Sequence, residues 1–332
     1  MLGRNDRVLV TGGTGVTGRH LVKQLCALGC RVRVFVRPSS NRSVLTGQPV
    51  EWVEGNVFDE RAVHTATKGV SYIFHLAGAY REAKVSDEHQ RLVHVRSTQL
   101  LAEAGAQNHE FKRFVHVSTV GVLGHIERPP ANEATAYNPG DMYQRTKAEG
   151  ELWLREFGAT AGLPFVVVRP AAIHGPGDRR LLKVFRMAKL PIVPLVGFSK
   201  GLYHLIHVED LVDFILLAAH HPRALGELFI CGNPASTTIR EVIQTVGAHL
   251  GNVPKFVRVP AWPLVLAGAA CERVCRPLGI EPPLHRRRVA FFTKDRCFDT
   301  SKMRRLTGFE CKYSNSTGLL ATAEWYRHHG WL

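Results

Sequence analysis

VLVTGGTGVTG, residues 8–18, is the stretch of this chain that decides its fold. An apolar run comes first, three glycines follow at regular spacing (Gly12, Gly15 and Gly18), and an amphipathic segment then continues over residues 19–28. Glycine lets a turn adopt left-handed backbone angles and approach a ligand closely, while the free N–H groups and positive dipole at the start of a helix attract an anion. The stretch therefore predicts a strand, a tight turn and a helix that together bind a pyrophosphate.

A second β-like run, VRVFV at residues 32–36, completes a strand–helix–strand unit around this turn. An ordinary strand-to-helix turn is the alternative interpretation, and the order of strand, glycines, helix and second strand disfavours it. TGGTGVTG resembles the TGxxGxxG fingerprint of the extended short-chain dehydrogenase/reductase family. The resemblance implies an α/β fold, a doubly wound parallel-sheet Rossmann fold with a smaller, mostly C-terminal substrate-binding lobe. It also implies nicotinamide dinucleotide contacts from Gly12, Thr14, Gly15 and Val16.

The length of 332 residues exceeds one typical domain, and a Rossmann core with a smaller lobe accounts for it. We expect the core over residues 1–175 and the lobe over residues 176–332, with residues 203–232 returning to the core. With 45% apolar residues and no room for a signal peptide before the first strand, we expect a cytoplasmic protein. The seven cysteines show no CxxC spacing and the 17 histidines no HExxH motif, so reduced thiols and no metal site are expected.

Basic residues exceed acidic ones, 43 Lys and Arg against 28 Asp and Glu, giving a formal charge of +15. From Gly251 onward 14 basic residues face 6 acidic ones. This excess is compatible with a solvated basic face, an anionic cofactor, an acidic substrate or a membrane surface. Nucleic acid is not an expected partner, because the arginines are not interleaved with aromatic residues in a recognisable binding module.

Two segments resemble cofactor-binding elements of the same family. GNVFD at residues 55–59 is similar to the GDLxD segment, whose first acidic side chain accepts a hydrogen bond from adenine; Asn56 takes that place, can also accept, and is followed by Val57. HLAG at residues 75–78 resembles the HxAG turn, which implies that the cofactor is also contacted by Leu76, Ala77 and Gly78. The helix predicted over residues 87–106 carries His94 where the family usually has Asn.

Tyr143 and Lys147 are the most informative pair in the chain. They lie four residues apart in a helix predicted over residues 142–161, so their side chains share one face. A phenol with a pKa of about 10 is a weak acid or base at neutral pH, and an adjacent ammonium favours the phenolate. The pair therefore predicts a proton carrier, Tyr143, beside a lysine that also donates to the nicotinamide ribose.

Ser118 and Thr119 stand at the end of a strand predicted over residues 114–118. Open parallel sheets bind ligands outside the carboxyl ends of their strands, although hydroxyls that merely cap the strand are the alternative. The family resemblance implies that Thr119 polarises the substrate oxygen and that Ser118 lies beside the cofactor. The predicted reaction transfers a hydride between C4 of nicotinamide and a carbinol carbon, with Tyr143 moving the hydroxyl proton.

RPAAIHGPGD at residues 169–178 resembles the family's RPxxIYGPGD, which implies cofactor contacts from Pro170 and Ile173. Nucleotide-sugar enzymes of the family usually carry Asn at the position of Ala172, and alanine offers no hydrogen bond to a diphosphate. The sequence from residue 280 onward looks more like the 3β-hydroxysteroid dehydrogenase and dihydroflavonol reductase-like branch. An alcohol/ketone oxidoreductase is therefore favoured over a nucleotide-sugar epimerase or dehydratase. The intact Thr119, Tyr143 and Lys147 disfavour a non-catalytic nucleotide-sensing protein.

Arg37 at the end of the second predicted strand indicates the cofactor. NAD-specific enzymes place a carboxylate about 20 residues beyond the glycines, whereas an arginine accommodates the 2′-phosphate of NADP. No acid occurs between Asp6 and Glu51, and Arg37 resembles an arginine of the dihydroflavonol reductases, with Arg42 able to assist. NADP(H) is the predicted cofactor, and NAD(H) is the alternative. The alternative interpretation of Arg37 is a solvated charge at the end of a strand.

The apolar residues in the second half of the chain predict a hydrophobic pocket for a hydrophobic alcohol or ketone. PIVPLVG at residues 191–197 is expected to lie in a loop over residues 191–201, and the apolar run at residues 260–271 is expected to be a buried helix of the lobe. An interfacial helix, and with it peripheral membrane contact, is the alternative for this run. The helices over residues 87–106 and 142–161 could form the seam of a homodimer. Further candidates for the pocket walls are Trp262, Leu264, Leu266, Phe291 and Phe292.

Overall fold

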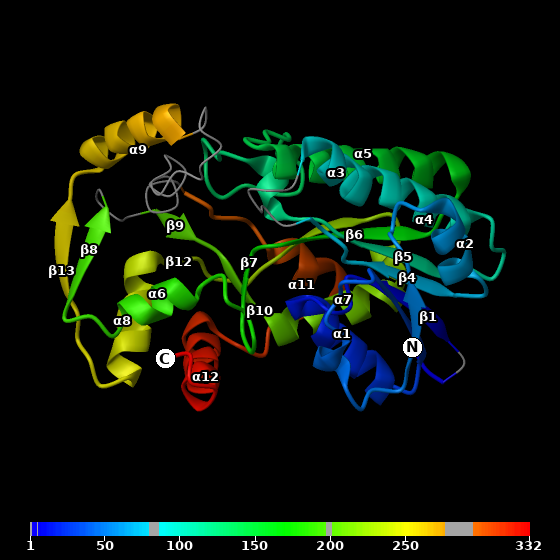
Figure 1. The fold of residues 1–332 in the computed structure, drawn as a ribbon, viewed down its shortest axis with the longest axis horizontal. Coiled ribbons are helices and arrows are strands. Elements are labelled where there is room, and N and C mark those ends of the chain that lie inside the picture. The colour runs from blue at the N-terminus through cyan, green and yellow to red at the C-terminus, as the bar shows by residue number, and fades with distance from the viewer. Residues whose placement is uncertain (1, 5, 80–85, 197–200, 276–294) are drawn as a thin grey trace.

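A seven-stranded parallel sheet forms the centre of the computed structural model, which describes residues 2–4, 6–79, 86–196, 201–275 and 295–332. The strands follow the spatial order β11-β6-β5-β4-β1-β2-β3, and Figure 1 labels β6, β5, β4 and β1 of this sheet. Their bounds are β1 Arg7–Thr11, β2 Arg31–Val36, β3 Val50–Glu54, β4 Tyr72–His75, β5 Arg113–Val117, β6 Phe165–Pro170 and β11 Leu228–Cys231. The order reverses between β1 and β4, which is where a doubly wound sheet opens a crevice for a dinucleotide. The predicted Rossmann fold is confirmed.

Helices cover both faces of this sheet, as Figure 1 shows. On one face lie α1 Val16–Ala27 and α7 Val208–His220; on the other lie α2 Glu60–Thr67, α4 Ser97–Ala106 and α5 Met142–Ala161. Successive strand residues enter opposite layers: Val8 and Val10 pack against α1 and α7, while Leu9 packs on the other side. Both faces being buried explains why the strands are nearly continuous apolar runs rather than alternating ones.

The predicted helix over residues 87–106 contains a break in its hydrogen-bond pattern. It begins as α3 Asp87–Arg91, continues as a π-helical turn over Leu92–Arg96, and ends as α4. Such turns insert one extra residue and re-aim side chains, and they occur often at functional sites. Periodicity gave the extent of the helix correctly and could not show this turn.

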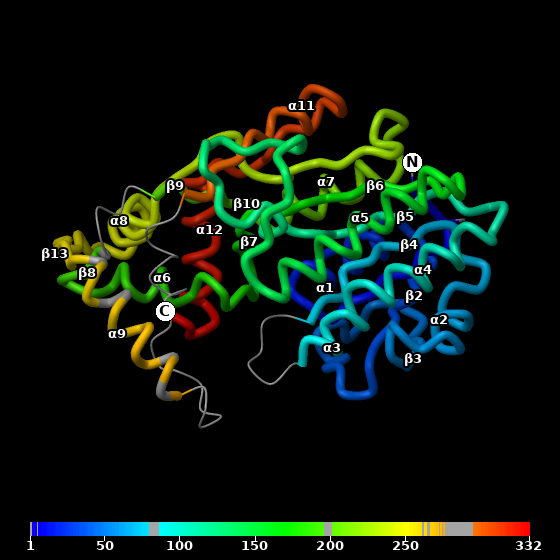
Figure 2. The backbone as a smooth tube through the Cα atoms, turned by 90° about the horizontal axis from the view of Figure 1, so that it is seen from above, coloured from blue at the N-terminus to red at the C-terminus, as the bar shows by residue number. Residues whose placement is uncertain are grey.

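The lobe lies beyond the carboxyl ends of β5 and β6, at the left in Figures 1 and 2. It contains three strand pairs: β7 Ala172–His174 with β10 Leu205–His207, β9 Leu202–Tyr203 with β12 Thr237–Thr238, and β8 Ile192–Val196 with β13 Lys255–Val259. Its helices are α6 Leu182–Met187, α8 Ile239–His249, α9 Ala261–Cys275 and α12 Asn315–His328, while α11 Ser301–Thr307 packs near β11. Short 3-10 turns lie at Arg42–Leu45, Val120–Leu123 and Pro222–Ala224.

Two expectations for the lobe are wrong. The loop expected over residues 191–201 contains β8, because alternate side chains, Val193 and Leu195, are buried in the lobe core. The apolar helix expected to be buried, α9, instead exposes Trp262 by 69% and Leu266 by 61%, so these two side chains do not line an interior pocket. The other proposed wall residues, Phe291, Phe292 and the side chain of Leu264, lie outside the described part of the structure.

Candidate active site

The glycine turn packs directly against the end of β4. Gly12 has a left-handed φ of 70°, and a Cβ atom there would come within 2.8 Å of the Leu76 carbonyl and 2.9 Å of the Ala77 nitrogen. Only glycine fits this backbone contact. The turn and the HLAG segment, two stretches predicted to bind the cofactor, therefore lie against each other, and Gly78 follows on the exposed side.

The start of α1 leaves backbone donors for an anion. Gly15 is the N-cap residue and supplies no side-chain hydrogen bond, and Thr14 and Val16 flank it with partial exposure. Gly18 fits because a Cβ atom there would overlap the Gly12 carbonyl oxygen at 2.1 Å, so its role is to seat α1 on the turn. First-turn N–H groups without a capping side chain suit a pyrophosphate.

A buried hydrogen-bond chain holds the two cofactor segments together. The Ala77 N–H donates to Thr11 Oγ1 at 3.2 Å, and Thr11 Oγ1 contacts His75 Nδ1 at 2.8 Å. His75 Nε2 lies 3.1 Å from the hydroxyl of Ser97, which itself donates to the Val93 carbonyl. This directionality makes Nε2 the protonated nitrogen of a neutral ring. Complete burial, reinforced by Lys147, lowers the pKa of His75 to about 3.

The residues predicted to contact adenosine lie at the carboxyl ends of β2 and β3. The Gly55 N–H donates to the Val36 carbonyl at 2.9 Å, which brings Asn56 and Val57 beside the strand that Arg37 follows. Asn56 and Arg37 are exposed, and Val57 is buried. Arg42, considered as an assistant to Arg37, pairs instead with Glu54 and lies over the ring of Trp52.

The two hydroxyls after β5 have different partners. Ser118 is buried and donates to Glu151 Oε2 at 2.6 Å. Thr119 is partly exposed, and its Oγ1 accepts the Gly121 N–H at 3.0 Å. A hydroxyl that accepts a backbone hydrogen bond keeps its own proton for donation. Of the two, Thr119 is therefore the one able to donate to a substrate oxygen.

Tyr143 and Lys147 lie in the first turns of α5, whose N-cap Asp141 accepts the Gln144 N–H at 2.9 Å. Gly121, beside Thr119, approaches the side chain of Gln144, so the start of α5 abuts the strand end that carries Thr119. The Lys147 ammonium donates to the Val117 carbonyl at 2.8 Å. Burial lowers the pKa of Lys147 to about 8, against a raising effect of Glu151, so the group is still largely charged at neutral pH.

His94, which stands where the family usually has Asn, is held by its neighbours on two sides. The Ala79 N–H donates to Nε2 at 3.0 Å, so in the neutral ring Nδ1 carries the proton and faces Thr146 Oγ1 at 2.8 Å. The ring meets that of Tyr143 edge to face at 5.3 Å between centroids. Burial, reinforced by Lys147, lowers the pKa of His94 to about 2. His94 is thus a neutral residue that positions Tyr143 and the end of the HLAG segment.

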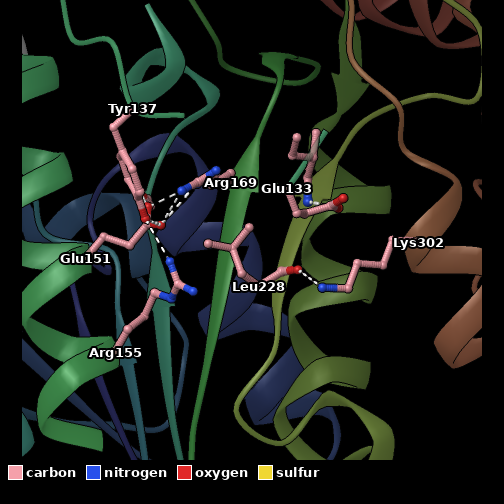
Figure 3. A network of polar contacts seen from close by, with 9 residues as sticks. Glu133, Tyr137, Glu151, Arg155, Arg169, Leu228 and Lys302 are labelled. Carbon is pink, nitrogen blue, oxygen red and sulfur yellow. Dashed lines mark hydrogen bonds and ion pairs between the residues drawn. The ribbon is translucent and has the colours of Figure 1, made fainter. Parts of the chain in front are cut away.

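A buried ion pair lies one helical turn beyond Lys147 (Figure 3). Arg169 Nη2 donates to Glu151 Oε1 at 2.6 Å, both side chains are fully buried, and the Tyr137 hydroxyl donates to the same carboxylate at 2.6 Å. The guanidinium lies over the Tyr137 ring at 4.7 Å. With Ser118 as a further donor, Glu151 ties α5, β5 and β6 together immediately behind Thr119 and Lys147.

The segment after β6 connects the core to the lobe. Pro170 ends β6, and Ile173 lies in β7 opposite Ile206 of β10. Ala172 packs partly into the lobe core. His174, where the family usually has Tyr, is buried and lies 3.0 Å from Thr322 Oγ1, and burial lowers its pKa to about 3.

Sequence reasoning missed the supporting residues Thr11, His75, Tyr137, Glu151 and Arg169. Thr11, His75 and Arg169 lie inside recognised motifs, and Glu151 follows Lys147 at the same i, i+4 spacing that links Tyr143 to Lys147. That spacing was the available signal for Glu151. The loop residue Tyr137 carries no such pattern.

Known proteins that resemble this chain in sequence carry the names of one enzyme family and of its members. The sequence model of the NAD-dependent epimerase/dehydratase family matches residues 8–232. Among characterised relatives, sterol demethylase protein B of Methylococcus capsulatus is 28% identical over 98% of this chain and 99% of its own length. Ceramide reductase of Caulobacter vibrioides is 28% identical, covering 98% and 96%. A 3β-hydroxysteroid dehydrogenase/Δ5→4-isomerase of Mycobacterium tuberculosis is 28% identical, covering 96% and 90%.

Among solved structures, UDP-glucose 4-epimerase of Thermotoga maritima, crystallised with UDP-glucose, superposes with a TM-score of 0.77. It is 23% identical, and the match covers 97% of this chain and 99% of that one. At this identity the likeness shows the shared fold.

Proposed function

Because the chain belongs to the NAD-dependent epimerase/dehydratase family, we propose that it is an oxidoreductase that interconverts a secondary alcohol and a ketone on a largely hydrophobic substrate. The observation that carries the proposal is the placement of Thr119 and Lys147. Thr119 retains a hydroxyl proton to donate, and Lys147 is a buried ammonium one helical turn from Tyr143.

The residues present fit a nicotinamide dinucleotide. The Gly12 contact leaves no space for a side chain beside Leu76 and Ala77, and the first turn of α1 has uncapped donors for the diphosphate. Asn56 and Val57 would hold the adenine end, and Pro170 and Ile173 the nicotinamide end. Arg37 favours NADP(H), because its exposed guanidinium can meet a ribose 2′-phosphate and no carboxylate stands in its place.

When bound, the nicotinamide supplies or accepts the hydride. In the reductive direction, Tyr143 and Thr119 donate hydrogen bonds to the substrate carbonyl, and Tyr143 transfers its proton to the oxygen that becomes the alcohol. Lys147 stabilises the tyrosinate that remains, since an adjacent ammonium favours the charged phenol. His94 is neutral and fully engaged, so it orients Tyr143 without exchanging protons with it.

The hydrophobic substrate is supported by what the RPAAIH segment lacks. Ala172 offers no hydrogen bond to a sugar-nucleotide diphosphate, and its methyl group packs partly into the lobe core. The relatives named for sterols, ceramide and a 3β-hydroxysteroid point to the same substrate class. Each Å² of apolar substrate surface buried would contribute about 25 cal/mol.

The alternative within the family is a nucleotide-sugar epimerase or dehydratase, which the description of the family model supports. The two are separated by mixing purified protein and NADP(H) or NAD(H) with hydroxysteroids, aryl ketones and UDP-sugars while nicotinamide absorbance is followed. We expect net turnover with a hydrophobic alcohol or ketone and a preference for NADP(H). Thermal stabilisation of the cofactor-loaded protein by UDP-sugars and none by hydrophobic ketones would reverse the ranking.

A further inference from the structure

Exposed apolar side chains concentrate at one end of the lobe. In the described part of the chain nine large hydrophobic side chains are exposed, and six of them lie in two short stretches, residues 190–192 and 253–266. They are Leu190, Ile192, Val253, Val257, Trp262 and Leu266. Single exposed apolar residues are ordinary on a protein surface, whereas a cluster marks an interaction site. We call the β8–β13 strand pair together with α9 the lobe tip.

The β8–β13 pair has an outward face that is mostly apolar. The register pairs Ile192 with Lys255 and Pro194 with Val257, and all four of these residues are exposed. The opposite face buries Val193 and Leu195 in the lobe core. A two-stranded pair with one buried face normally alternates apolar with polar residues. Here only Lys255 keeps the outward face polar.

Helix α9 is apolar around its whole circumference over most of its length. Residues 261–271 contain no charged side chain, and Trp262, Leu266 and Ala270, spaced one helical turn apart, are exposed in a stripe that ends at exposed Arg273. A helix of this composition is usually buried in a core or in lipid. Its 15 residues span roughly 22 Å, short of a bilayer core of about 30 Å, and no helix among the described residues is long and apolar enough to cross a membrane.

The charged residues around this surface are mostly basic, which indicates an anionic partner. Segments 186–196 and 251–275 contain five basic residues, Arg186, Lys189, Lys255, Arg258 and Arg273, against one acid, Glu272. An apolar surface with a basic rim and an exposed tryptophan suits the interface of an anionic bilayer. A second copy of the chain suits it poorly, because a two-fold contact would bring this basic rim against itself.

We propose that the lobe tip docks on the surface of anionic lipid membranes, with the α9 stripe inserted among the headgroups. In Figures 1 and 2, α9 lies beyond the N-terminal end of α5, the end that carries Tyr143. Docking therefore brings the catalytic end of α5 toward the phase in which a hydrophobic substrate is dissolved. This last step rests on the proposed function, and docking itself does not.

The test is co-sedimentation of the full chain with vesicles, without cofactor or substrate, so that it is independent of the proposed reaction. We expect the parent protein to bind phosphatidylcholine/phosphatidylglycerol vesicles more tightly than pure phosphatidylcholine vesicles. The double substitution Trp262→Glu/Leu266→Glu should lower the partition coefficient at least tenfold. The matched control, Leu28→Glu/Leu225→Glu, changes two exposed leucines that lie outside the lobe tip, and it should bind like the parent.

A second measurement keeps the test independent of folding defects in the double variant. Brominated lipids should quench tryptophan fluorescence of the parent, and the conservative Trp262→Phe variant should lose that quenching. Absence of parent binding, equal binding of the double variant, or unchanged quenching in Trp262→Phe would overturn the proposal. Loss of a parent dimer in the double variant without vesicles would also overturn it, by showing that a second copy covers the lobe tip.

Discussion

Replacing Glu151 by alanine should destabilise the protein far more than removing an ion pair of the same length from the surface. In the parent, Arg169 Nη2 lies 2.6 Å from Glu151 Oε1 with both side chains fully buried. The substitution leaves the guanidinium buried without its carboxylate, and its Nη1 already has no hydrogen-bond partner among the described residues. Ser118 and Tyr137 lose their acceptor as well. Breaking a buried pair in this way costs about 3–5 kcal/mol.

The surface comparison is the pair Arg96–Glu60, whose Nη2–Oε1 distance is also 2.6 Å but whose side chains are 38% and 72% exposed. Glu60→Ala should cost between about 0 and 1 kcal/mol. An unfolding entropy of roughly 2.1 cal/mol/K per residue gives about 0.7 kcal/mol/K for 332 residues. The expected loss of Tm is therefore about 4–7 °C for Glu151→Ala and about 1 °C or less for Glu60→Ala.

Thermal unfolding followed by circular dichroism measures both shifts. The double substitution Glu151→Leu/Arg169→Met removes both charges together and should recover more than half of the loss, because no unpaired charge remains in the core. The reasoning is refuted if Glu151→Ala lowers the Tm no more than Glu60→Ala does. It is equally refuted if the double variant melts as low as the single one.

Three further predictions concern the site. Tyr143→Phe should lower turnover by about 10² or more while cofactor binding, measured by fluorescence titration, persists; near-normal turnover would remove Tyr143 from the mechanism. Burial lowers the pKa of Lys147 to about 8, so the unfolded chain binds more protons than the folded one between about pH 8 and 10.5. The free energy of unfolding of the parent should therefore rise with pH in this window relative to that of Lys147→Met. The same pH dependence of the free energy of unfolding in both proteins, measured by urea denaturation, would contradict this. The same titration should make kcat/KM fall as pH rises through about 8. Arg37→Asp should shift the ratio of kcat/KM values from NADP(H) toward NAD(H), and a parent enzyme without preference would contradict the role of Arg37.

Local sequence signals predicted the parts of the structure that depend on local chemistry. The glycine turn, the strands of the core and the exact extent of α5 follow from glycine spacing, apolar runs and helical periodicity. The different partners of Ser118 and Thr119 could not be predicted in this way. Which hydroxyl stays available is decided by Glu151, which lies 33 residues from Ser118 in the chain.

Burial of the lobe elements was the other feature that the sequence left undetermined. The apolar composition of α9 predicts an apolar environment and does not say whether protein or lipid provides it. Likewise the loop expected over residues 191–201 contains the strand β8. Its pairing with β13, more than 60 residues later, supplies the strand contacts that the local pattern lacked.

The order of the strands also determines when each part of the sheet can form during synthesis of the chain. Strand β6 is an interior strand of the finished sheet, next to the edge strand β11, and its residues Val166, Val167 and Val168 are fully buried. Yet β11 and the covering helix α7 are encoded only after residues 171–207 of the lobe. At about 5–20 residues per second, the nascent chain carries β6 with an open apolar edge for roughly 3–12 s. A fragment that stops at Gly175 would keep that edge permanently, and edges of this kind recruit other chains. Synthesis of this protein therefore passes through a stage at which one edge of β6 is open to association with other chains.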